Sequence, residues 1–259
     1  MAYKGLPSIR SALFCDARLA RLSFVLQKQQ TPSTAVTGAD MRTAILLLGC
    51  LATCISLPAV ASGQNQLGDP KQAIEQAFWK DLYGTGGTSL YCGQTFTTPG
   101  STFTASPIYS SKQLKSALRC VTDRQCTIMN PRYPFIAADL HNHYPALTRV
   151  ELARRNAQFA ELAADVPSKF ADIGCDMKTS FQLVEPRDEA KGNIARAIFY
   201  MHVEYDLPIV GLVSMYKNWH RMDPPDAEEK ARNDKIEVLQ GTRNRFIDDP
   251  SLVDQLIAD

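Results

Sequence analysis

The stretch AADLHNHYPA, residues 137–146, concentrates side chains that can bind a metal ion or move a proton. It places Asp139, His141, Asn142 and His143 within five consecutive positions. Asp and Asn oxygens are hard ligands that suit Mg²⁺ or Ca²⁺, whereas imidazole suits softer metals or acid–base chemistry. If the stretch begins as a helix, Asp139 shares one side of it with Asn142 and His143.

The following segment, LTRVELARRNAQFAEL, adds Arg149, Arg154 and Arg155, whose guanidinium groups can hold a phosphate. Carboxamide, imidazole and guanidinium together suit phosphodiester cleavage, in which a metal binds the scissile phosphate and a base activates water. The same residues also fit a simpler interpretation. Asp139 then caps a helix, His141 and Asn142 bond to backbone, and the arginines form a solvated face. Spacing alone leaves both interpretations open.

The elements that must position these residues are mainly helical. Apolar residues at helical spacing predict four longer helices, at 71–84, 186–207, 209–219 and 223–241. The last of them is expected to begin with Asp223 as its N-cap and to end at Gly241. A short helix is expected at 112–120, and an irregular loop at 121–135.

Only one part of the chain has a β-like composition. Residues 85–111 are rich in Thr, Ser, Tyr and Phe with Gly and Pro between them, which predicts short strands or a hairpin. From Ile136 onward the chain is expected to be mainly helical. The sequence therefore predicts the α+β class, with a mainly helical single domain around a small β-hairpin.

A secretory signal is predicted well inside the N-terminus. From Met41 the chain has one basic residue, a fourteen-residue apolar run at 44–57, then Pro58 and small residues up to Ala61. This order predicts a signal peptide cleaved after Ala61. The run is shorter than the about 20 residues that a membrane helix needs. The alternative, a buried core helix, gives the small-residue ending no packing purpose.

A signal peptide begins at the start codon, so we hypothesise that Met41 is the true initiator. The predicted organisation follows in chain order: 1–40 an over-extended N-terminus, 41–61 the signal peptide, 62–70 a linker, 71–248 the domain, and 249–259 a tail. The mature protein is then expected in the periplasm or outside the cell.

Cysteine usage agrees with export. Three of the seven cysteines lie before residue 62, which leaves Cys92, Cys120, Cys126 and Cys175. An even number in an exported chain predicts two disulfides out of three connectivities. We favour Cys120 with Cys126, which closes a short loop, and Cys92 with Cys175. A zinc site is the alternative, although no Cys-x-x-Cys pair is present.

The charge balance excludes a strongly basic protein. Six of the 28 Lys and Arg residues and two of the 27 Asp and Glu residues lie in 1–61. The rest of the chain therefore carries 22 basic and 25 acidic residues, a formal charge of −3. Without a basic excess, any contact with nucleic acid must depend on a local patch.

Four motifs occur in a specific order: DLYGTGGTSLYCG, ADLHNHYPA, EPRDEAKGNIARAIFYM and DPPDAEEKARNDKIEVLQGTRNRFID. In this order they resemble the endonuclease I family of secreted bacterial nucleases, of the ββα-metal or His-Me finger type. The resemblance covers nearly the whole predicted mature chain. It implies a ββα-metal core, magnesium or a similar divalent ion such as calcium as cofactor, and non-specific cleavage of DNA and often RNA. We expect a monomer without membrane attachment after signal cleavage.

The resemblance also implies roles for individual residues. Asn142 corresponds to a metal ligand of the family, with Asp139 as a further oxygen donor. Arg154 corresponds to the arginine that contacts the cleaved phosphate. Two more arginines and an amide, Arg149, Arg155 and Asn156, are expected to bind the substrate.

One motif of the family has no counterpart in this chain. The family has a Glu-His pair on the strand before the Asp-Leu-His-Asn motif, in which Glu binds the metal and His activates the water. The best match, TASPIYSS, has Ser106 and Pro107 in these places. Serine is a weak neutral ligand, and proline has no side-chain base. The resemblance thus identifies a nuclease whose catalytic pair is replaced.

His143 stands where the family commonly has an aliphatic residue, which makes it the candidate for a relocated base. In-line attack tolerates little displacement of the imidazole. His202 and His220 lie among apolar neighbours and are expected to be structural. Two hypotheses follow: an exported, metal-dependent endonuclease, or a pseudo-nuclease retained as a nucleic-acid or protein-binding module.

Overall fold

The structure is a computed structural model that describes residues 63–155 and 157–259. The predicted signal peptide lies outside these residues. The helices and helical turns are α1 (Pro70–Gln72), η1 (Ala73–Leu82), α2 (Ser111–Ala117), α3 (Asp123–Met129), α4 (Tyr133–Ala138), η2 (Leu140–Asn142), α5 (Thr148–Arg154), η3 (Ala171–Ile173), α6 (Asp188–Tyr205), α7 (Val213–Met222), α8 (Ala227–Gln240), α9 (Arg245–Asp248) and α10 (Leu252–Leu256). The strands are β1 (Gly87–Thr88), β2 (Thr95–Phe96), β3 (Phe103–Pro107), β4 (His143–Leu147), β5 (Gln158–Phe159), β6 (Ser168–Phe170), β7 (Cys175–Ser180) and β8 (Leu183–Glu185). The α+β class is confirmed.

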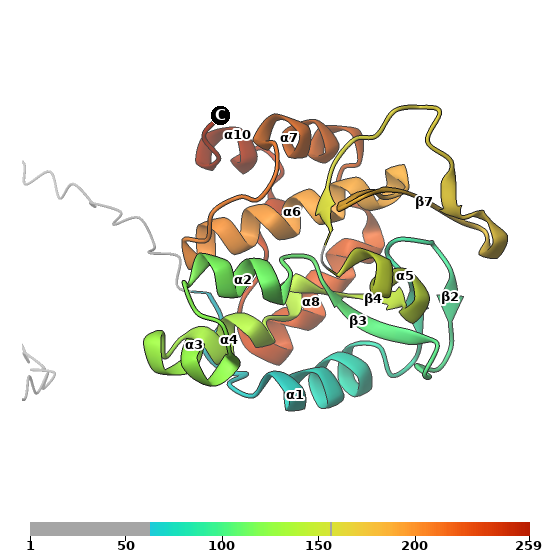
Figure 1. Ribbon diagram of the computed structural model, residues 1–259. Coiled ribbons are helices and arrows are strands. Elements are labelled where there is room, and N and C mark those ends of the chain that lie inside the picture. Colours follow the sequence, from blue (N-terminus) through green and yellow to red (C-terminus); the bar gives the residue numbers. More distant parts are fainter. Residues whose placement is uncertain (1–62, 156) are drawn as a thin grey trace, which may run out of the picture. The chain divides into compact units, whose positions relative to one another are not determined.

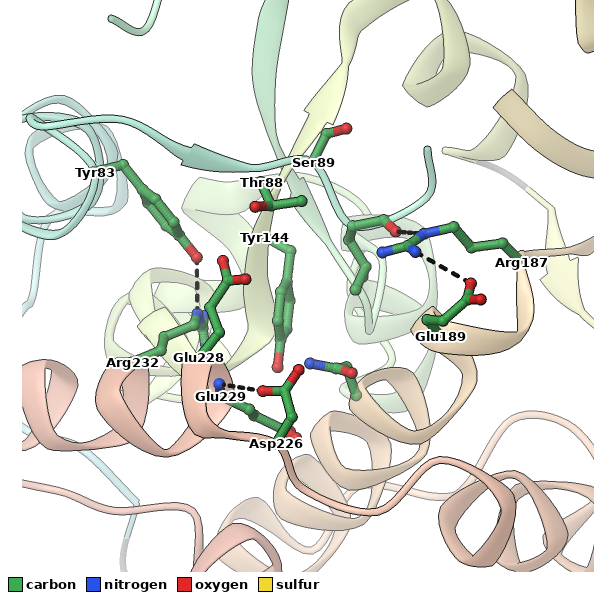
Figure 2. Close-up of a pocket in the computed structure, with 12 residues that line it drawn as sticks. Tyr83, Thr88, Ser89, Tyr144, Arg187, Glu189, Asp226, Glu228, Glu229 and Arg232 are labelled. Carbon is green, nitrogen blue, oxygen red and sulfur yellow. Dashed lines mark hydrogen bonds and ion pairs between the residues drawn. The ribbon is translucent and has the colours of Figure 1, made fainter. Parts of the chain in front are cut away.

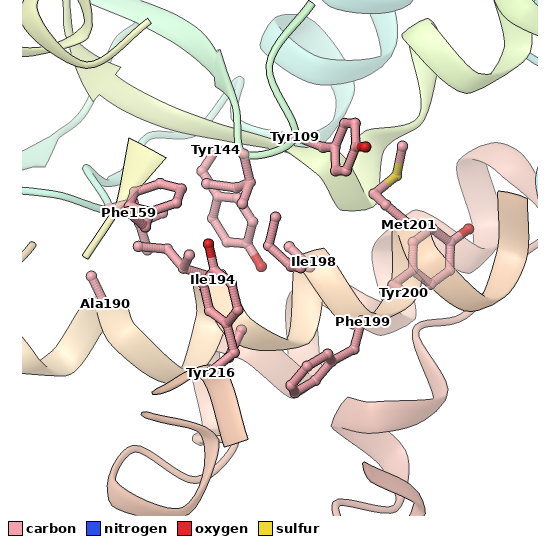
Figure 3. Packing of buried hydrophobic residues seen from close by; sticks show 14 of the residues in the cluster. Tyr109, Tyr144, Phe159, Ala190, Ile194, Ile198, Phe199, Tyr200, Met201 and Tyr216 are labelled. Carbon is pink, nitrogen blue, oxygen red and sulfur yellow. The ribbon is translucent and has the colours of Figure 1, made fainter. Parts of the chain in front are cut away.

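Helix α6 forms the centre of the core (Figure 1). Its residues Ile194, Ala197, Ile198 and Met201 are buried, as their helical spacing predicted. Figure 3 shows Ile194 and Ile198 beside Tyr144 of β4 and Tyr216 of α7. Apolar side chains from the other helices and from β4 pack against α6, so this helix supports β4 and the strand paired with it. None of the helices in the described part of the chain has the length and apolarity needed to cross a bilayer.

The strands β3 and β4 pair antiparallel, and β4 leads directly into α5. Together they form a ββα arrangement (Figure 1). They are not a hairpin, since α2, α3 and α4 lie between them in the chain. The register pairs Ser106 with Tyr144 and Pro107 with His143. Side chains of directly paired residues lie on the same face. Ser106 therefore shares one face with Tyr144, and Pro107 shares the other with His143.

Three expectations about local structure are wrong. The stretch from Asp139 does not begin an α-helix but forms the turn η2 and the strand β4, because Ile108 N donates to Asn142 O at 2.8 Å and draws the chain into β pairing. Residues 121–135 are not an irregular loop, since Thr122 caps α3 and Pro134 lies in the first turn of α4. Residues 85–111 are not the only β-like part of the chain, since the region after Ile136, although mainly helical as expected, also contains a sheet of four strands.

That sheet has the order β5-β8-β7-β6, with β5 parallel to β8 and the other neighbours antiparallel. Both predicted disulfides are confirmed: Cys92 is bonded to Cys175 at the start of β7, and Cys120 to Cys126. The zinc alternative is therefore wrong. The longer link joins residues 83 positions apart and fixes the sheet to the segment before β3.

Helix α8 ends at Gly241, as expected, where a φ of 76° suits glycine. Its start differs from the expectation, since Asp226 and not Asp223 is the N-cap and accepts a hydrogen bond from Glu229 N. The helix begins only after the two prolines, Pro224 and Pro225. Asp223 instead accepts from Gly192 N at 2.8 Å and links the loop before α8 to α6.

Both ends of the described region pack on the domain. Gln64, in the segment expected as a linker, is buried and donates through its backbone N–H to the Tyr205 hydroxyl at 2.9 Å. In the segment expected as a tail, Val253 of α10 is buried.

The bidentate ion pair between Arg196 of α6 and Glu229 of α8 is fully buried, with distances of 2.9 and 2.5 Å. We predict that Arg196→Met lowers the free energy of unfolding by roughly 3–5 kcal/mol, because Glu229 becomes a buried charge without a partner. The exposed pair of Arg221 with Asp254 is the control. Arg221→Ala should cost less than about 1 kcal/mol in the same denaturant titration. Equal losses would contradict the prediction.

Candidate active site

Ser106, at the place of the missing carboxylate, is fully buried and hydrogen-bonded to a carboxylate from another element. Its hydroxyl donates to Glu151 of α5 and lies 3.0 Å from the hydroxyl of Tyr91. Burial raises the pKa of Glu151, and the Arg154 charge and the Ser106 hydrogen bond partly oppose this. A carboxylate therefore reaches β3 at residue 106, although the strand itself carries none there.

Sequence reasoning missed Glu151 and Tyr91. Glu151 precedes Arg154 by three positions in TRVELARR, so the two residues share a face of any helix formed there. That spacing was the available signal. Tyr91 lies 15 residues before Ser106, and no local pattern indicates their contact.

Pro107, at the place of the missing base, lies beside His143. Directly paired residues in an antiparallel sheet have Cβ atoms about 4.5–5.5 Å apart. The Nδ1 atom of His143 lies 2.8 Å from Asp139 O. Because a carbonyl oxygen can only accept, Nδ1 carries the proton and Nε2 keeps a free lone pair. Burial lowers the pKa of His143, which keeps the ring neutral at pH 7.

His143 is one of the residues that line a cavity of about 560 Å³ between α1, α2, α3 and α4. Asp69, Lys71 and Ser111 line the same cavity. A neutral imidazole with an oriented acceptor nitrogen beside a hollow of this size can take a proton from a water molecule.

Arg154 is completely buried, and its guanidinium is turned toward the backbone of β3. One terminal nitrogen donates to Pro107 O at 2.6 Å, the other donates to Ile108 O, and the Phe159 ring lies 4.8 Å from the guanidinium carbon. Its Nε is buried without a partner in the described part of the chain. As it lies here, Arg154 holds the end of β3, and its Nε–H is without an acceptor among the described residues.

Asn142 is buried and paired with the backbone of Tyr109. Its Oδ1 accepts from Tyr109 N at 2.7 Å, and its Nδ2 donates to Tyr109 O at 3.1 Å. A carboxamide oxygen has two lone pairs, so Oδ1 can still bind a cation with the second.

The carboxylate of Asp139 is fully used by other groups. One oxygen accepts from His141 N at 2.8 Å and from the Gln240 amide at 2.9 Å. The other accepts from the hydroxyls of Tyr200 at 2.9 Å and Tyr205 at 2.5 Å. Four hydrogen bonds occupy its acceptor sites, so Asp139 has none left for a metal ion.

The structure separates the other candidate residues from Arg154. Arg149 is exposed and pairs with Asp172 at 2.6 Å. Arg155 is exposed at the end of α5. Asn156 lies outside the described residues. His202 and His220, expected to be structural, contact the backbone oxygens of Leu207 at 2.7 Å and Pro250 at 3.0 Å, respectively.

On the Tyr144 face of the strand pair, a small cavity of about 60 Å³ lies between β4, α6 and α8 (Figure 2). Arg232 lies 4.0 Å from the Tyr144 ring centre and donates to Leu140 O and His143 O at 2.6 Å each. The carboxylates of Glu189, Asp226, Glu228 and Glu229 line the same cavity. This cavity is too small and too acidic to accept a phosphate chain.

Comparison with known proteins agrees with the family resemblance of the four sequence motifs. The sequence profile of a family described as Endonuclease I matches residues 72–251. An extracellular deoxyribonuclease of Aeromonas hydrophila is 28% identical over 232 residues, which cover 78% of this chain and 96% of that protein. An extracellular ribonuclease of Bacillus amyloliquefaciens is 33% identical over 137 residues, 46% of each chain. An Endonuclease-1 of Buchnera aphidicola is 31% identical over 133 residues, which cover 50% of this chain and 49% of that protein. The last two matches thus span about half of each relative.

His141 predicts a pH dependence of stability. Burial lowers its pKa from 6.5 to about 4. As the pH falls below about 6.5, the unfolded chain takes up the proton first, so stability is complete above that pH and is lost toward pH 4. His141→Gln should reduce the stability lost between pH 7 and pH 5 by about 2 kcal/mol. Urea titrations at both pH values measure this, and an unchanged loss would contradict it.

Proposed function

This chain belongs to the endonuclease I family, and we propose that it is an exported nuclease that hydrolyses DNA and RNA without sequence preference, using a divalent cation. The names of its relatives support a periplasmic or extracellular location and nucleic-acid substrates. One observation carries the proposal: each missing group of the catalytic pair has a chemical equivalent beside its place on β3. Glu151 contacts Ser106, and His143 lies opposite Pro107.

The donors near β3 fit a magnesium-like ion that keeps most of its water. No three Asp, Glu, His or Cys side chains gather as a metal cage within residues 63–155 and 157–259. Mg²⁺ commonly uses only one or two carboxylates, with water and substrate phosphate completing its octahedron. Glu151 and Asn142 supply the two hard oxygens for such an ion. When bound, the ion would polarise the scissile phosphate and stabilise its developing charge.

His143 performs the proton transfer in this proposal. Its Nε2 takes a proton from a water molecule while the water oxygen forms a bond to phosphorus. The phosphorus–oxygen bond to the leaving nucleoside breaks, and that oxygen takes a proton from solvent. The carbonyl of Asp139 fixes the tautomer, so it acts as a positioning group through Nδ1.

One observation favours a second candidate, a nucleic-acid-binding protein without turnover. Arg154 is completely buried and its terminal nitrogens hold backbone oxygens, so a phosphate can reach it only after a rearrangement that exposes it. The two candidates differ in whether bonds are cut.

We predict that the full chain nicks supercoiled plasmid with Mg²⁺ and that a chelator stops it. Removal of a general base lowers hydrolysis by about 100-fold or more, so His143→Ala should lose this activity while His202→Gln keeps it. Calorimetry with Mn²⁺ should show weaker binding for Glu151→Gln and unchanged binding for Glu189→Gln, an exposed carboxylate. A wild type that binds Mn²⁺ and nucleic acid but never nicks would establish the second candidate.

The cross-strand position of His143 allows a sharper test. The double variant Pro107→His with His143→Leu moves the imidazole from β4 to β3, the strand that carries it in the family. We expect the double variant to recover at least about tenfold of the activity lost in His143→Leu alone. No recovery in a folded double variant would mean that His143 is not a relocated base.

A further inference from the structure

The turn between β7 and β8 has an unexpected residue at its tip. Ser180 pairs with Leu183, which leaves Phe181 and Gln182 as a two-residue loop. Phe181 has a φ of 51°, and the first position of a two-residue loop with positive φ normally holds glycine. The Phe181 side chain is 99% exposed, so packing does not compensate for the strained backbone. Strain kept in this way points to a role for the side chain itself.

Phe181 forms one edge of a cavity of about 680 Å³. Lys112 and Gln113 of α2 also line it, together with Tyr109 and Ser110. Gln158 and Gln182 also line it, and their side chains have no hydrogen-bond partner within the described residues. The cavity thus combines an exposed aromatic ring with free carboxamides, which can both donate and accept.

Charge and position connect this cavity to the candidate active site. Lys112 is its one charged lining residue among those the structure describes, so an anion meets no repelling carboxylate there. Tyr109, which lines it, is the residue whose backbone binds Asn142. The preceding residue, Ile108, accepts a hydrogen bond from Arg154. A chain bound at β3 can therefore continue into the cavity.

We propose that this cavity is a subsite for an unpaired nucleobase of a single-stranded nucleic acid. The base stacks on Phe181, and Gln158 and Gln182 meet its hydrogen-bonding edge, while Lys112 approaches the neighbouring phosphate. Stacking on an exposed aromatic ring accepts any base because every base has a π-face. The inference rests on the proposed function for its ligand class but not on bond cleavage.

A single strand fits better than a duplex. In a duplex both faces of each base are covered by its neighbours, so Phe181 cannot stack on one without unstacking the helix. The subsite would make the protein prefer single-stranded regions, and the sugar type is left open because the contacts go to the base and the phosphate.

The test is the binding of fluorescein-labelled twelve-residue oligothymidylate and oligouridylate to the full chain with a chelator, followed by fluorescence anisotropy. Phe181→Gly is the main variant, because glycine suits the positive φ and should leave the melting temperature unchanged or higher. Loss of one stacking contact should weaken binding of the single strands about tenfold. Phe181→Trp should bind within about twofold of the wild type, and Val238→Ala, an exposed residue of α8, should change nothing.

Lys112→Ala should also weaken binding and reduce the salt dependence by about one phosphate contact. Binding of a twelve-base-pair duplex should not respond to Phe181→Gly. Tenfold weaker single-strand binding by a folded Phe181→Gly supports the subsite even if plasmid is never nicked. Unchanged binding by that variant, or a wild type that does not bind single strands, overturns it. If such a wild type still nicks plasmid, the subsite fails and the proposed function stands.

Discussion

The ββα unit depends on two buried guanidinium groups that bind main-chain carbonyls. Two paired strands alone are marginally stable in water, so β3 and β4 need support from outside. Arg154 of α5 supplies it at the end of β3, and Arg232 of α8 supplies it at Leu140 and His143. Planar guanidinium groups suit this because each offers several donors in fixed directions. The fold is thus fixed through backbone atoms at the place where the candidate chemistry lies.

This manner of support explains why the strand tolerates an unusual pair at residues 106 and 107. Arg154 donates to backbone carbonyl oxygens at the end of β3, and every residue has such an oxygen. The side chains at residues 106 and 107 can therefore change without loss of these contacts. Glu151 and His143 come from α5 and β4, two elements that pack against the strand. A carboxylate and an imidazole carried by these neighbours stay within reach of the same stretch of backbone.

Much of the fold could be predicted from the sequence, because local signals specify it. The apolar spacing of α6 and the glycine that ends α8 were read from neighbouring residues, and the cysteine number predicted two disulfides, whose favoured pairing the structure confirms. Contacts between residues far apart in the sequence could not be predicted in this way. β4 is a strand because β3 offers it partners 36 to 44 residues earlier, and no pattern within HNHYPAL shows that. Likewise the buried carboxylate of Asp139 is held by Tyr200, Tyr205 and Gln240, 61 to 101 residues away. Hence Asp139 looked like a ligand until its partners were known.

The bond between Cys92 and Cys175 has a further consequence for durability. The connection between β5 and β6, residues 160–167, is largely exposed and lies between the two cysteines. Exposed loops are where proteases cut first. A single cut there separates the chain into two pieces that remain covalently joined, so the clipped protein would run as one band on a gel until it is reduced. Outside the cell, where proteases are common, such a molecule can be nicked and still keep its parts together.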